Sequence, residues 1–299
     1  MTECYTEYKR RVEGLIKVLI EENTEKPYRQ FVEYAMSGGK RIRSIIALSI
    51  IDKQVEGMNL SEQARTTVEL TCLVSELLHS SSLIIDDLPC MDDAKVRRGR
   101  PCMHVKYDEA VAILTTAHLL TMSTRLYTWS YNELKPFGLG CPENLITLVE
   151  KVSTCMSFEG ASGGQMMDLQ RVVTHEPDAL KKMMSRKTSS FFQISIIGAV
   201  LVCASLPLSD RDLSRYMSVS DLTGIAFQIY DDFEDILEDD GGSNNSVTSN
   251  GVHACYLQFT NCVSACKNTL RDLGSDTQVF DDIMHMMRMS IERKMNGGM

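Results

Sequence analysis

Residues 70–93 read LTCLVSELLHSSSLIIDDLPCMDD, an apolar run that ends in paired aspartates. The spacing i, i+4, i+7 and i+8, which marks one face of a helix, is met by Leu70, Val74, Leu77, Leu78 and Ser81. The pattern predicts a long helix that carries carboxylates at its carboxyl end. Helical periodicity recurs along the chain while strand-like alternation is scarce, so the sequence indicates an all-α fold.

These aspartates are the first of two acidic clusters. The first cluster, Asp86-Asp87-Leu88-Pro89-Cys90-Met91-Asp92-Asp93, is followed by Arg97-Arg98-Gly99. The second, Asp231-Asp232-Phe233-Glu234-Asp235, ends another largely apolar run. Carboxylates repel one another and are costly to gather on a buried face. Gathering them twice indicates bound hard cations, and Mg²⁺ shared with substrate phosphates is the usual occupant.

The composition is that of a globular protein, with 299 residues of which 43% are hydrophobic and 24% charged. A net charge of −9 argues against general nucleic-acid binding. The ten cysteines lie among apolar neighbours and no secretory signal is evident, which favours reduced thiols in a cytoplasmic protein. Cys262 and Cys266 share a helix face but lack the partners of a zinc site.

The uncharged stretch from Thr188 to Ser209 is long enough to span a bilayer. Interspersed Ser and Gln residues and Pro207 favour a buried core helix, so no transmembrane segment is expected. No strong linker or repeat divides the chain, which predicts one domain over 1–299, a large helical bundle around a deep central cavity. We expect helices at 5–22, 27–37, 41–53, 61–87, 107–131, 143–171, 178–205, 210–239, 253–272 and 277–296.

Each acidic cluster can be interpreted as part of a functional site or as acids without a functional role. On a helix, Asp231 and Asp235 share a face, and Gln228 lies one turn before Asp232. The apolar residues before this cluster favour a cavity wall over a solvated acidic face. In the first cluster, a bulge at the helix-disturbing Pro89 could bring Asp92 onto the face of Asp86. The alternative there is a helix-ending loop with incidental acids.

Cations flank the acidic clusters. Near the amino end, the segment 37–43 reads Ser-Gly-Gly-Lys-Arg-Ile-Arg, a glycine turn that opens a helix with three cations. Backbone N–H groups and Arg forks at a helix start suit a diphosphate. His79 lies two turns before Asp86 on one face, which favours a donor to phosphate over a merely packed side chain. Weaker candidates for the same cavity are Lys187-Thr188 and Gln165 with Asp168.

In chain order, the combination D-D-L-P-x-M-D with R-R-G, then K-T, then F-Q-x-x-D-D-x-x-D resembles the trans-isoprenyl diphosphate synthases of the farnesyl and geranylgeranyl type. The matches run from Gly38 to Asp235, with a final helix expected around Ser290–Lys294. The resemblance implies an all-α isoprenoid synthase-like fold, a homodimer and three Mg²⁺ ions. It also implies head-to-tail condensation of isopentenyl diphosphate with allylic diphosphates.

The resemblance assigns a role to each matching residue. Metal ligands would be Asp86, Asp92 and Asp231, with Asp87, Asp232 and Asp235 beside them. The isopentenyl diphosphate pocket would comprise Lys40, Arg43, His79 and Arg98. The allylic diphosphate pocket would comprise Arg97, Lys187, Thr188 and Gln228. The catalytic set would be the six aspartates with Arg97 and Lys187, because cations stabilise the charge that builds on departing pyrophosphate.

Product length should be set one turn before the first cluster. The growing tail would run from Asp86 back along its helix, past Ser82 and Ser81, with Leu78 as part of a floor. Both serines are small, whereas a bulky aromatic would close the tunnel. This predicts a product longer than farnesyl diphosphate, namely geranylgeranyl diphosphate; farnesyl and geranyl diphosphate are the shorter alternatives.

Two features depart from the family pattern. Ser44 replaces the proline that usually ends G-G-K-R-x-R-P, and no Lys or Arg occurs between Arg215 and Lys267, where the family carries lysines. That gap, with the Cys-x-x-x-Cys pair, leaves open a weakly active regulatory subunit of a heterodimer. A terpene cyclase is a further alternative, disfavoured by Lys40, Arg43 and the second aspartate cluster.

Overall fold

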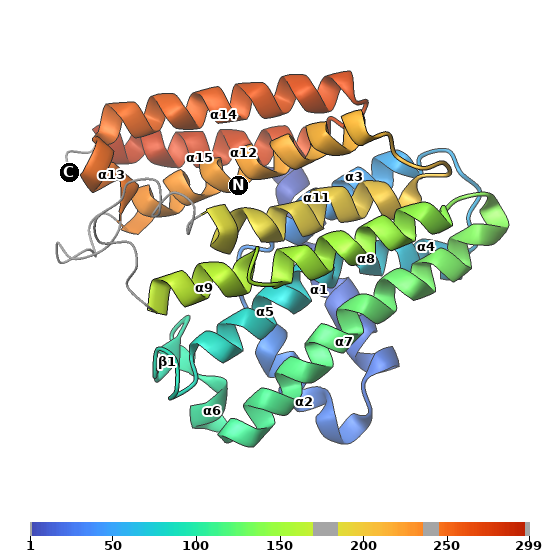
Figure 1. Cartoon of the computed structure of the whole chain (residues 1–299), viewed down its shortest axis with the longest axis horizontal. Coiled ribbons are helices and arrows are strands. Elements are labelled where there is room, and N and C mark those ends of the chain that lie inside the picture. Colours follow the sequence, from blue (N-terminus) through green and yellow to red (C-terminus); the bar gives the residue numbers. More distant parts are fainter. Residues whose placement is uncertain (1, 170–184, 236–244, 297–299) are drawn as a thin grey trace. The chain divides into compact units, whose positions relative to one another are not determined.

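The computed structural model describes residues 2–169, 185–235 and 245–296 (Figure 1). Among these residues nearly all regular structure is helical, which confirms the all-α prediction. The chain divides into two compact units. The first unit comprises Thr6–Val149 and Gly198–Pro207, and the second comprises Met1–Tyr5, Glu150–Ile197 and Leu208–Met299.

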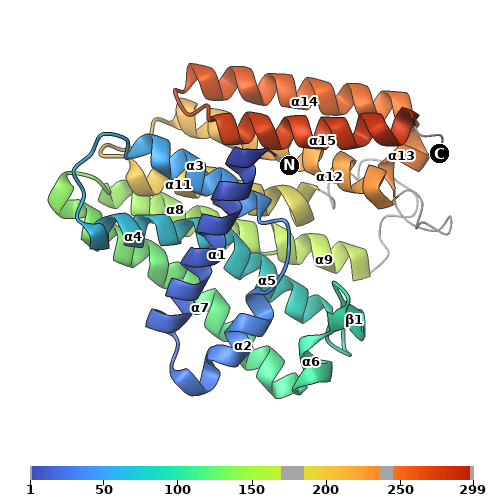
Figure 2. The ribbon, with the colours of Figure 1, turned by 180° about the vertical axis from the view of Figure 1, so that it is seen from behind.

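The first unit carries the first acidic cluster and the glycine turn. Its described elements are α1 (Glu3–Asn23, from Thr6 on), α2 (Lys26–Met36), α3 (Ile42–Gln54), α4 (Glu62–Leu70), η1 (Thr71–Leu73), α5 (Val74–Asp86), β1 (Val96–Arg97), β2 (Arg100–Pro101), α6 (Met103–Lys106), α7 (Glu109–Leu134), η2 (Lys135–Phe137) and the start of α8 (Pro142–Met156). Helices α5 and α7 lie side by side in both views (Figures 1 and 2).

The second unit carries the second acidic cluster. Its described elements are the end of α8, then α9 (Ala161–Leu169), the π-helical turn η3 (Ser185–Ser189), α11 (Ser190–Cys203, as far as Ile197), α12 (Asp210–Asp235), α13 (Ser246–Asn250), α14 (Val252–Asp272) and α15 (Gln278–Asn296). Helix α12 lies against both α14 and α15 (Figures 1 and 2).

The core of the first unit explains why its helices hold the site in place. Helix α3 is buried from Ile42 to Ile51 apart from Arg43, as expected for a helix that is apolar all round. On α5, Leu77 and Leu78 are fully or almost fully buried. Each such leucine contributes roughly 1.5–3 kcal/mol relative to an exposed position. The residues that precede Asp86 are therefore a rigid part of the core.

The expected helix 61–87 is divided into α4, η1 and α5. At the division the Thr71 hydroxyl donates to the Val68 carbonyl at 2.6 Å, and the Ser44 hydroxyl donates to the Cys72 carbonyl at 2.8 Å. A hydroxyl that bonds the backbone in this way competes with the regular helical pattern. The hydroxyl of Ser44, the residue that replaces the family's proline, thus ties α3 to this turn.

The expected helix 143–171 is likewise two helices, α8 and α9. A Cβ on Gly160 would lie 2.0 Å from the Cys155 carbonyl oxygen, and one on Gly163 would lie 1.8 Å from that of Phe158. Only glycine allows the chain to turn so tightly here. The short hairpin β1–β2 and helix α6 were also absent from the sequence-based prediction.

Within the described residues, one helical run, Glu62–Asp86, is long and apolar enough to cross a membrane by length and composition alone. Of its most apolar window, 72% is buried inside the protein, as in an ordinary core helix. The stretch from Thr188, considered above, forms in α11 an apolar helix of 14 residues, too short for a bilayer.

Candidate active site

The first acidic cluster follows the end of α5. The helix stops at Asp86, and the chain then turns back, so that the Asp92 N–H donates to the Asp86 carbonyl at 2.9 Å. Asp93 adopts a left-handed conformation in this loop, with φ of 49°. The structure thus has a helix-ending loop rather than a bulge within the helix. The loop still returns Asp92 to Asp86, so the two residues adjoin, with Asp86 buried and Asp92 exposed.

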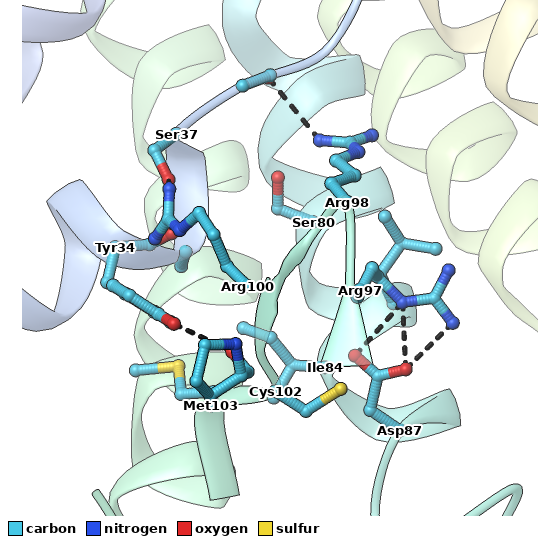
Figure 3. Close-up of a pocket in the computed structure, with 14 residues that line it drawn as sticks. Tyr34, Ser37, Ser80, Ile84, Asp87, Arg97, Arg98, Arg100, Cys102 and Met103 are labelled. Atoms are coloured by element: carbon cyan, nitrogen blue, oxygen red, sulfur yellow. Dashed lines mark hydrogen bonds and ion pairs between the residues drawn. The ribbon is translucent and has the colours of Figure 1, made fainter. Parts of the chain in front are cut away.

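A tight hairpin places the two arginines that follow this loop. Val96 pairs with Pro101 and Arg97 with Arg100, which leaves Arg98 and Gly99 as the turn. Both turn residues have positive φ, 51° and 72°, as a type I′ turn requires. A non-glycine residue in this region carries strain that often marks a functional site. Because Arg97 ends a strand and Arg98 begins the turn, their side chains reach different partners (Figure 3).

Arg97 is held by the buried carboxylate of Asp87. Its Nε donates to both carboxylate oxygens, at 2.8 and 3.0 Å, and its Nη2 lies 2.7 Å from Oδ1 (Figure 3). This hydrogen bonding raises the pKa of Arg97. Burial, and then the nearby Asp87 carboxylate, raise the pKa of the Cys102 thiol to about 11.

Arg98 lies on the glycine turn. Its Nη1 donates to the Gly38 carbonyl at 3.3 Å, and a Cβ on Gly39 would lie 3.1 Å from the same nitrogen. Gly38 and Gly39 have φ of 79° and 105°, which other residues rarely adopt. Burial lowers the pKa of Arg98, and nearby Arg41 and Arg97 lower it further. The glycines therefore let a cation lie directly against the backbone.

A pocket of about 110 Å³ lies between this hairpin, α5 and the end of α2. Its lining includes Ser37, Ser80, Asp87, Arg98 and Arg100 (Figure 3). Three of its lining side chains are arginines, which makes the pocket suitable for an anionic group.

His79 is half-buried on α5, close to several cations. Burial lowers its pKa well below the ordinary value, and the charges of Arg43, Arg98, Arg97 and Arg41 lower it further. The imidazole is therefore neutral at pH 7 and can donate one N–H to an anion. Arg43 and Arg98 of the predicted isopentenyl pocket therefore lie near His79, and Lys40 is exposed.

Arg41, one of the three cations after the glycine turn, was expected to help bind a diphosphate but is buried in ion pairs instead. Arg41 is 2% exposed and forms ion pairs with Glu76 at 3.1 Å and Glu13 at 2.8 Å. It also donates to the Met36 carbonyl. Arg41 therefore joins α1, α2 and α5 instead of contributing to a diphosphate cradle.

The second acidic cluster ends α12 in the second unit. Gln228 donates to Asp232 at 2.8 Å and accepts from the Thr188 hydroxyl at 3.1 Å. Asp232 is buried and also accepts from the Ser246 N–H at 2.9 Å and from the Ser246 hydroxyl. Asp231 is half-buried and Asp235 exposed. The sequence-based prediction had missed Ser246, whose only signal was its place after an Asn at a helix start.

A cation from the end of the chain reaches this cluster. Lys294 Nζ donates to the Glu234 carbonyl at 3.1 Å, and the Ser290 hydroxyl donates to the Glu234 carboxylate at 2.7 Å. Helix α15 thus places a lysine beside a cluster whose own sequence neighbourhood has none. The side chains of Lys187 and Asp168 lie outside the described residues, whereas Gln165 is described, and its Oε1 is buried with no hydrogen-bond partner among them.

The predicted length-determining residues lie on α5 before Asp86. Ser81 is fully buried and donates to the Leu78 carbonyl at 2.7 Å; Ser82 is half-buried and donates to the His79 carbonyl at 2.9 Å. Because both hydroxyls are satisfied by their own helix, these residues present small and effectively apolar surfaces.

Several acids of the two clusters are suited to bind Mg²⁺ together with a substrate phosphate. The described residues contain no ready group of three or more His, Cys, Asp or Glu side chains around one point. Asp87 is engaged by Arg97 and Asp232 by Ser246, so the better candidates are Asp86 and Asp92 in the first cluster and Asp231 and Asp235, separately, in the second. Mg²⁺ commonly takes one or two carboxylates and completes its shell with water and substrate phosphate. The residues fit an ion that arrives with a diphosphate.

The chain is similar to known proteins over most of its length. The family model described as "Polyprenyl synthetase" matches residues 25–249. Farnesyl diphosphate synthase of Bacillus subtilis is 31% identical over 79% of this chain and 76% of its own length. Geranylgeranyl diphosphate synthase of Pantoea ananas is 34% identical over 71% and 66%. The chain spans 56% of the chloroplastic geranylgeranyl pyrophosphate synthase 11 of Arabidopsis thaliana, at 28% identity.

Solved structures share the fold. A geranyltransferase of Legionella pneumophila superposes with a TM-score of 0.75 at 22% identity, covering 98% of this chain and 97% of that one. One of Helicobacter pylori gives 0.74 at 23% identity, covering 98% and 99%. With the acidic clusters, the paired arginines and the glycine turn in place, these matches establish that the chain belongs to the polyprenyl synthetase family of prenyltransferases.

Proposed function

We propose that this chain catalyses the Mg²⁺-dependent head-to-tail condensation of isopentenyl diphosphate with allylic diphosphates, and that its product is geranylgeranyl diphosphate. The observation that carries the proposal is the hairpin, which holds one arginine at the first acidic cluster and the next on the glycine turn. Family membership supports the reaction class.

Isopentenyl diphosphate would be bound by Lys40, Arg43, His79 and Arg98. Arg98 and Arg43 supply charge, and the glycine turn lets the diphosphate approach the backbone. A neutral His79 would add a hydrogen bond without adding charge, because its pKa is depressed. Orienting this substrate's double bond toward the allylic carbon is the main task of the pocket.

The allylic diphosphate would be bound by Arg97, Lys187, Thr188 and Gln228. Asp86, Asp92 and Asp231 would hold Mg²⁺, with Asp235 near them. When bound, the ions supply charge stabilisation for the pyrophosphate that leaves as the allylic C–O bond ionises. Arg97 stabilises the same charge by hydrogen bonding. Attack by the double bond and loss of a proton, which we assign to pyrophosphate, complete the condensation.

The proposed product length rests on α5 and on relatives. Ser81 and Ser82 are small side chains on α5 before Asp86, which supports a tail longer than farnesyl. Relatives in Pantoea ananas and Arabidopsis thaliana are named geranylgeranyl diphosphate synthases. The Bacillus subtilis relative is named a farnesyl diphosphate synthase, which keeps the shorter product as the second candidate.

We further propose one domain over residues 1–299, a homodimer and a cytoplasmic location. The chain passes between the two units at four points, and three of them fall inside helices, namely α1, α8 and α11, which supports a single domain. Exposed apolar side chains on α7 and α8 support self-association. They include Leu114 and Ile146, which are 70% and 69% exposed.

The test is to incubate purified protein with Mg²⁺, isopentenyl diphosphate and each of dimethylallyl, geranyl and farnesyl diphosphate, and to identify products by mass. Geranylgeranyl diphosphate should accumulate from every starter, and omission of Mg²⁺ should abolish it. Farnesyl diphosphate as the end product would favour the shorter synthase. Condensation only after addition of a second synthase subunit would favour the regulatory role. A cyclic hydrocarbon from one substrate alone would favour a cyclase.

A further inference from the structure

The second aspartate of the first cluster, Asp87, is set apart from its neighbours by what it contacts. Its side chain is only 6% exposed, and both oxygens face the Arg97 guanidinium at 2.7–3.0 Å. The Cys102 thiol lies beside the same carboxylate, which helps to raise the thiol pKa (Figure 3). Asp86 precedes it on α5, where successive residues point in directions about 100° apart. Asp87 is thus turned toward the hairpin (Figure 3).

These contacts occupy the carboxylate. A carboxylate offers about four lone-pair sites. Two nitrogens of Arg97 make three short contacts with the two oxygens of Asp87 and use most of those sites. Coordination of Mg²⁺ by Asp87 would require breaking a buried, charge-assisted pair, which is costly. The sequence grouped Asp87 with the metal-binding acids, but its geometry is that of an arginine clamp.

The same contacts fix the direction of Arg97. The pair is side-on, through Nε and Nη2, so the Nη1 donors and the second Nη2 donor are directed away from Asp87 (Figure 3). The Arg97 side chain is 36% exposed, so these donors can reach an incoming anion. An arginine held in this way loses little conformational freedom when it binds, and preorganised donors stabilise a transition state best.

The β1–β2 hairpin also holds the ion pair of Asp87 and Arg97, which we call the arginine clamp, in place. Cys102 N–H donates to the Lys95 carbonyl at 2.9 Å, which extends the pairing of β1 and β2 by one step. The thiol that contacts Asp87 therefore belongs to the ladder that carries Arg97. The ion pair of Asp87 with Arg97 thus links the carboxyl end of α5 to the hairpin.

We propose that Asp87 is a positioning residue that holds Arg97 ready for the allylic diphosphate, and that it is not a Mg²⁺ ligand. The proposal rests on the proposed function, because it assumes that Arg97 contacts a diphosphate. It separates the first cluster into two roles: Asp86 and Asp92 serve the metal, and Asp87 serves the arginine.

The test compares Asp87→Asn, Arg97→Gln and the double variant. Asp87→Asn should raise the KM for the allylic diphosphate by roughly 10- to 100-fold, the usual cost of losing a hydrogen bond to a charged group. The Mg²⁺ concentration for half-maximal rate should stay within about threefold of wild type. In the Arg97→Gln background, Asp87→Asn should change KM by less than about threefold, because the arginine it positions is gone.

Three further variants control the experiment. Asp87→Glu keeps the carboxylate, so its KM for the allylic diphosphate should be much closer to the wild-type value than that of Asp87→Asn. Cys102→Ala, which removes the buried thiol beside Asp87, should raise KM in the same direction by at most a few-fold. Asp93→Asn removes an exposed acid of the same loop, which forms an ion pair with the exposed Lys95, and should leave KM unchanged. Thermal unfolding of each variant identifies any loss of folding.

A binding measurement separates this proposal from the proposed function. Calorimetry with inorganic pyrophosphate and Mg²⁺ should show weaker pyrophosphate binding for Asp87→Asn even if no condensation is detected, in which case the proposed function fails and the clamp stands. A shifted Mg²⁺ requirement in Asp87→Asn, or full additivity with Arg97→Gln, would overturn the clamp while leaving the synthase assignment intact.

Discussion

At the scale of single residues, the site depends on a few backbone conformations that few side chains tolerate. Within the described residues, the non-glycine positions with positive φ are Arg41, Asp93 and Arg98, all in the loops that carry the acidic and basic motifs. Such strain costs of order 1–3 kcal/mol per residue and persists only where surrounding contacts stabilise it. In this protein, ion pairs and hydrogen bonds formed by the same loops are the contacts that stabilise these conformations.

Gly39 gives the sharpest test of this idea. Alanine there would have φ near 105° and a Cβ 3.1 Å from Arg98 Nη1. Gly39→Ala should lower the free energy of unfolding by about 1–3 kcal/mol and raise the KM for isopentenyl diphosphate. The control is Gly57→Ala, which has φ of 73° but no atom within 4 Å, and should leave KM unchanged. Equal KM effects in the two variants would contradict the account.

His79 predicts how stability depends on pH. Burial and the charges of Arg43, Arg98, Arg97 and Arg41 depress its pKa in the folded state. Below its ordinary pKa of about 6.5 the unfolded chain binds a proton that the folded chain does not, so stability falls as pH falls, by at most about 1.4 kcal/mol per pH unit. Urea unfolding of wild type and His79→Gln from pH 7.5 to 5 should show a shallower decline in the variant. Parallel curves would refute the depressed pKa.

At the scale of elements, contacts between distant segments set the geometry of the site. Arg41, at the start of α3, joins α1 through Glu13 and α5 through Glu76. The glycine turn that precedes α3 is thereby fixed relative to the helix that carries Asp86. Two charges with 1% and 6% exposed side chains need each other, because either alone would be a buried, uncompensated charge.

Arg41→Ala should therefore destabilise the protein by about 3–5 kcal/mol. The double variant Arg41→Met with Glu76→Leu should recover much of that loss, since apolar groups of similar volume often replace a buried pair without cost. Urea unfolding measures both. A double variant no more stable than Arg41→Ala would show that the charge pair is not the cause.

Helix α5 carries the prediction on product length. Ser81→Phe should shorten the main product, because an aromatic ring would fill space on the α5 wall before Asp86. Ser81→Ala should leave product length unchanged, since the hydroxyl bonds only to the Leu78 carbonyl of its own helix. Product masses from each starter measure both effects. A stable Ser81→Phe enzyme with the wild-type product would reject this placement.

At the scale of the whole molecule, exposed apolar side chains on α7 and α8 bear on assembly. Ile146 is 69% exposed, so replacing it costs little folding free energy. Light scattering should give wild type about twice the chain mass of 33.6 kDa, and Ile146→Asp should shift it toward one chain. Leu257→Asp, at a 53% exposed position on α14, is the matched control and should stay dimeric. Wild type at one chain mass would exclude the homodimer.

The sequence by itself determined the helices and the kinds of chemistry they carry. Helical periodicity is local, so the spacing from Leu70 to Ser81 is enough to predict α5, and the acidic clusters lie at helix ends as expected. The motifs also identified the family. The sequence did not predict that η1 interrupts the helix expected at 61–87, because this interruption depends on contacts such as that of Ser44 with Cys72, 28 residues away.

Only the tertiary structure decided which polar groups became partners. Asp87 and Arg97 are ten residues apart, Asp232 and Ser246 fourteen, and Arg41 and Glu76 thirty-five. Each pair forms because packing of apolar faces brings two chain segments within hydrogen-bond distance, and no local pattern encodes that proximity. Carboxylates that look equivalent in the sequence therefore acquire different roles, according to which cation or N–H group the fold presents to each one.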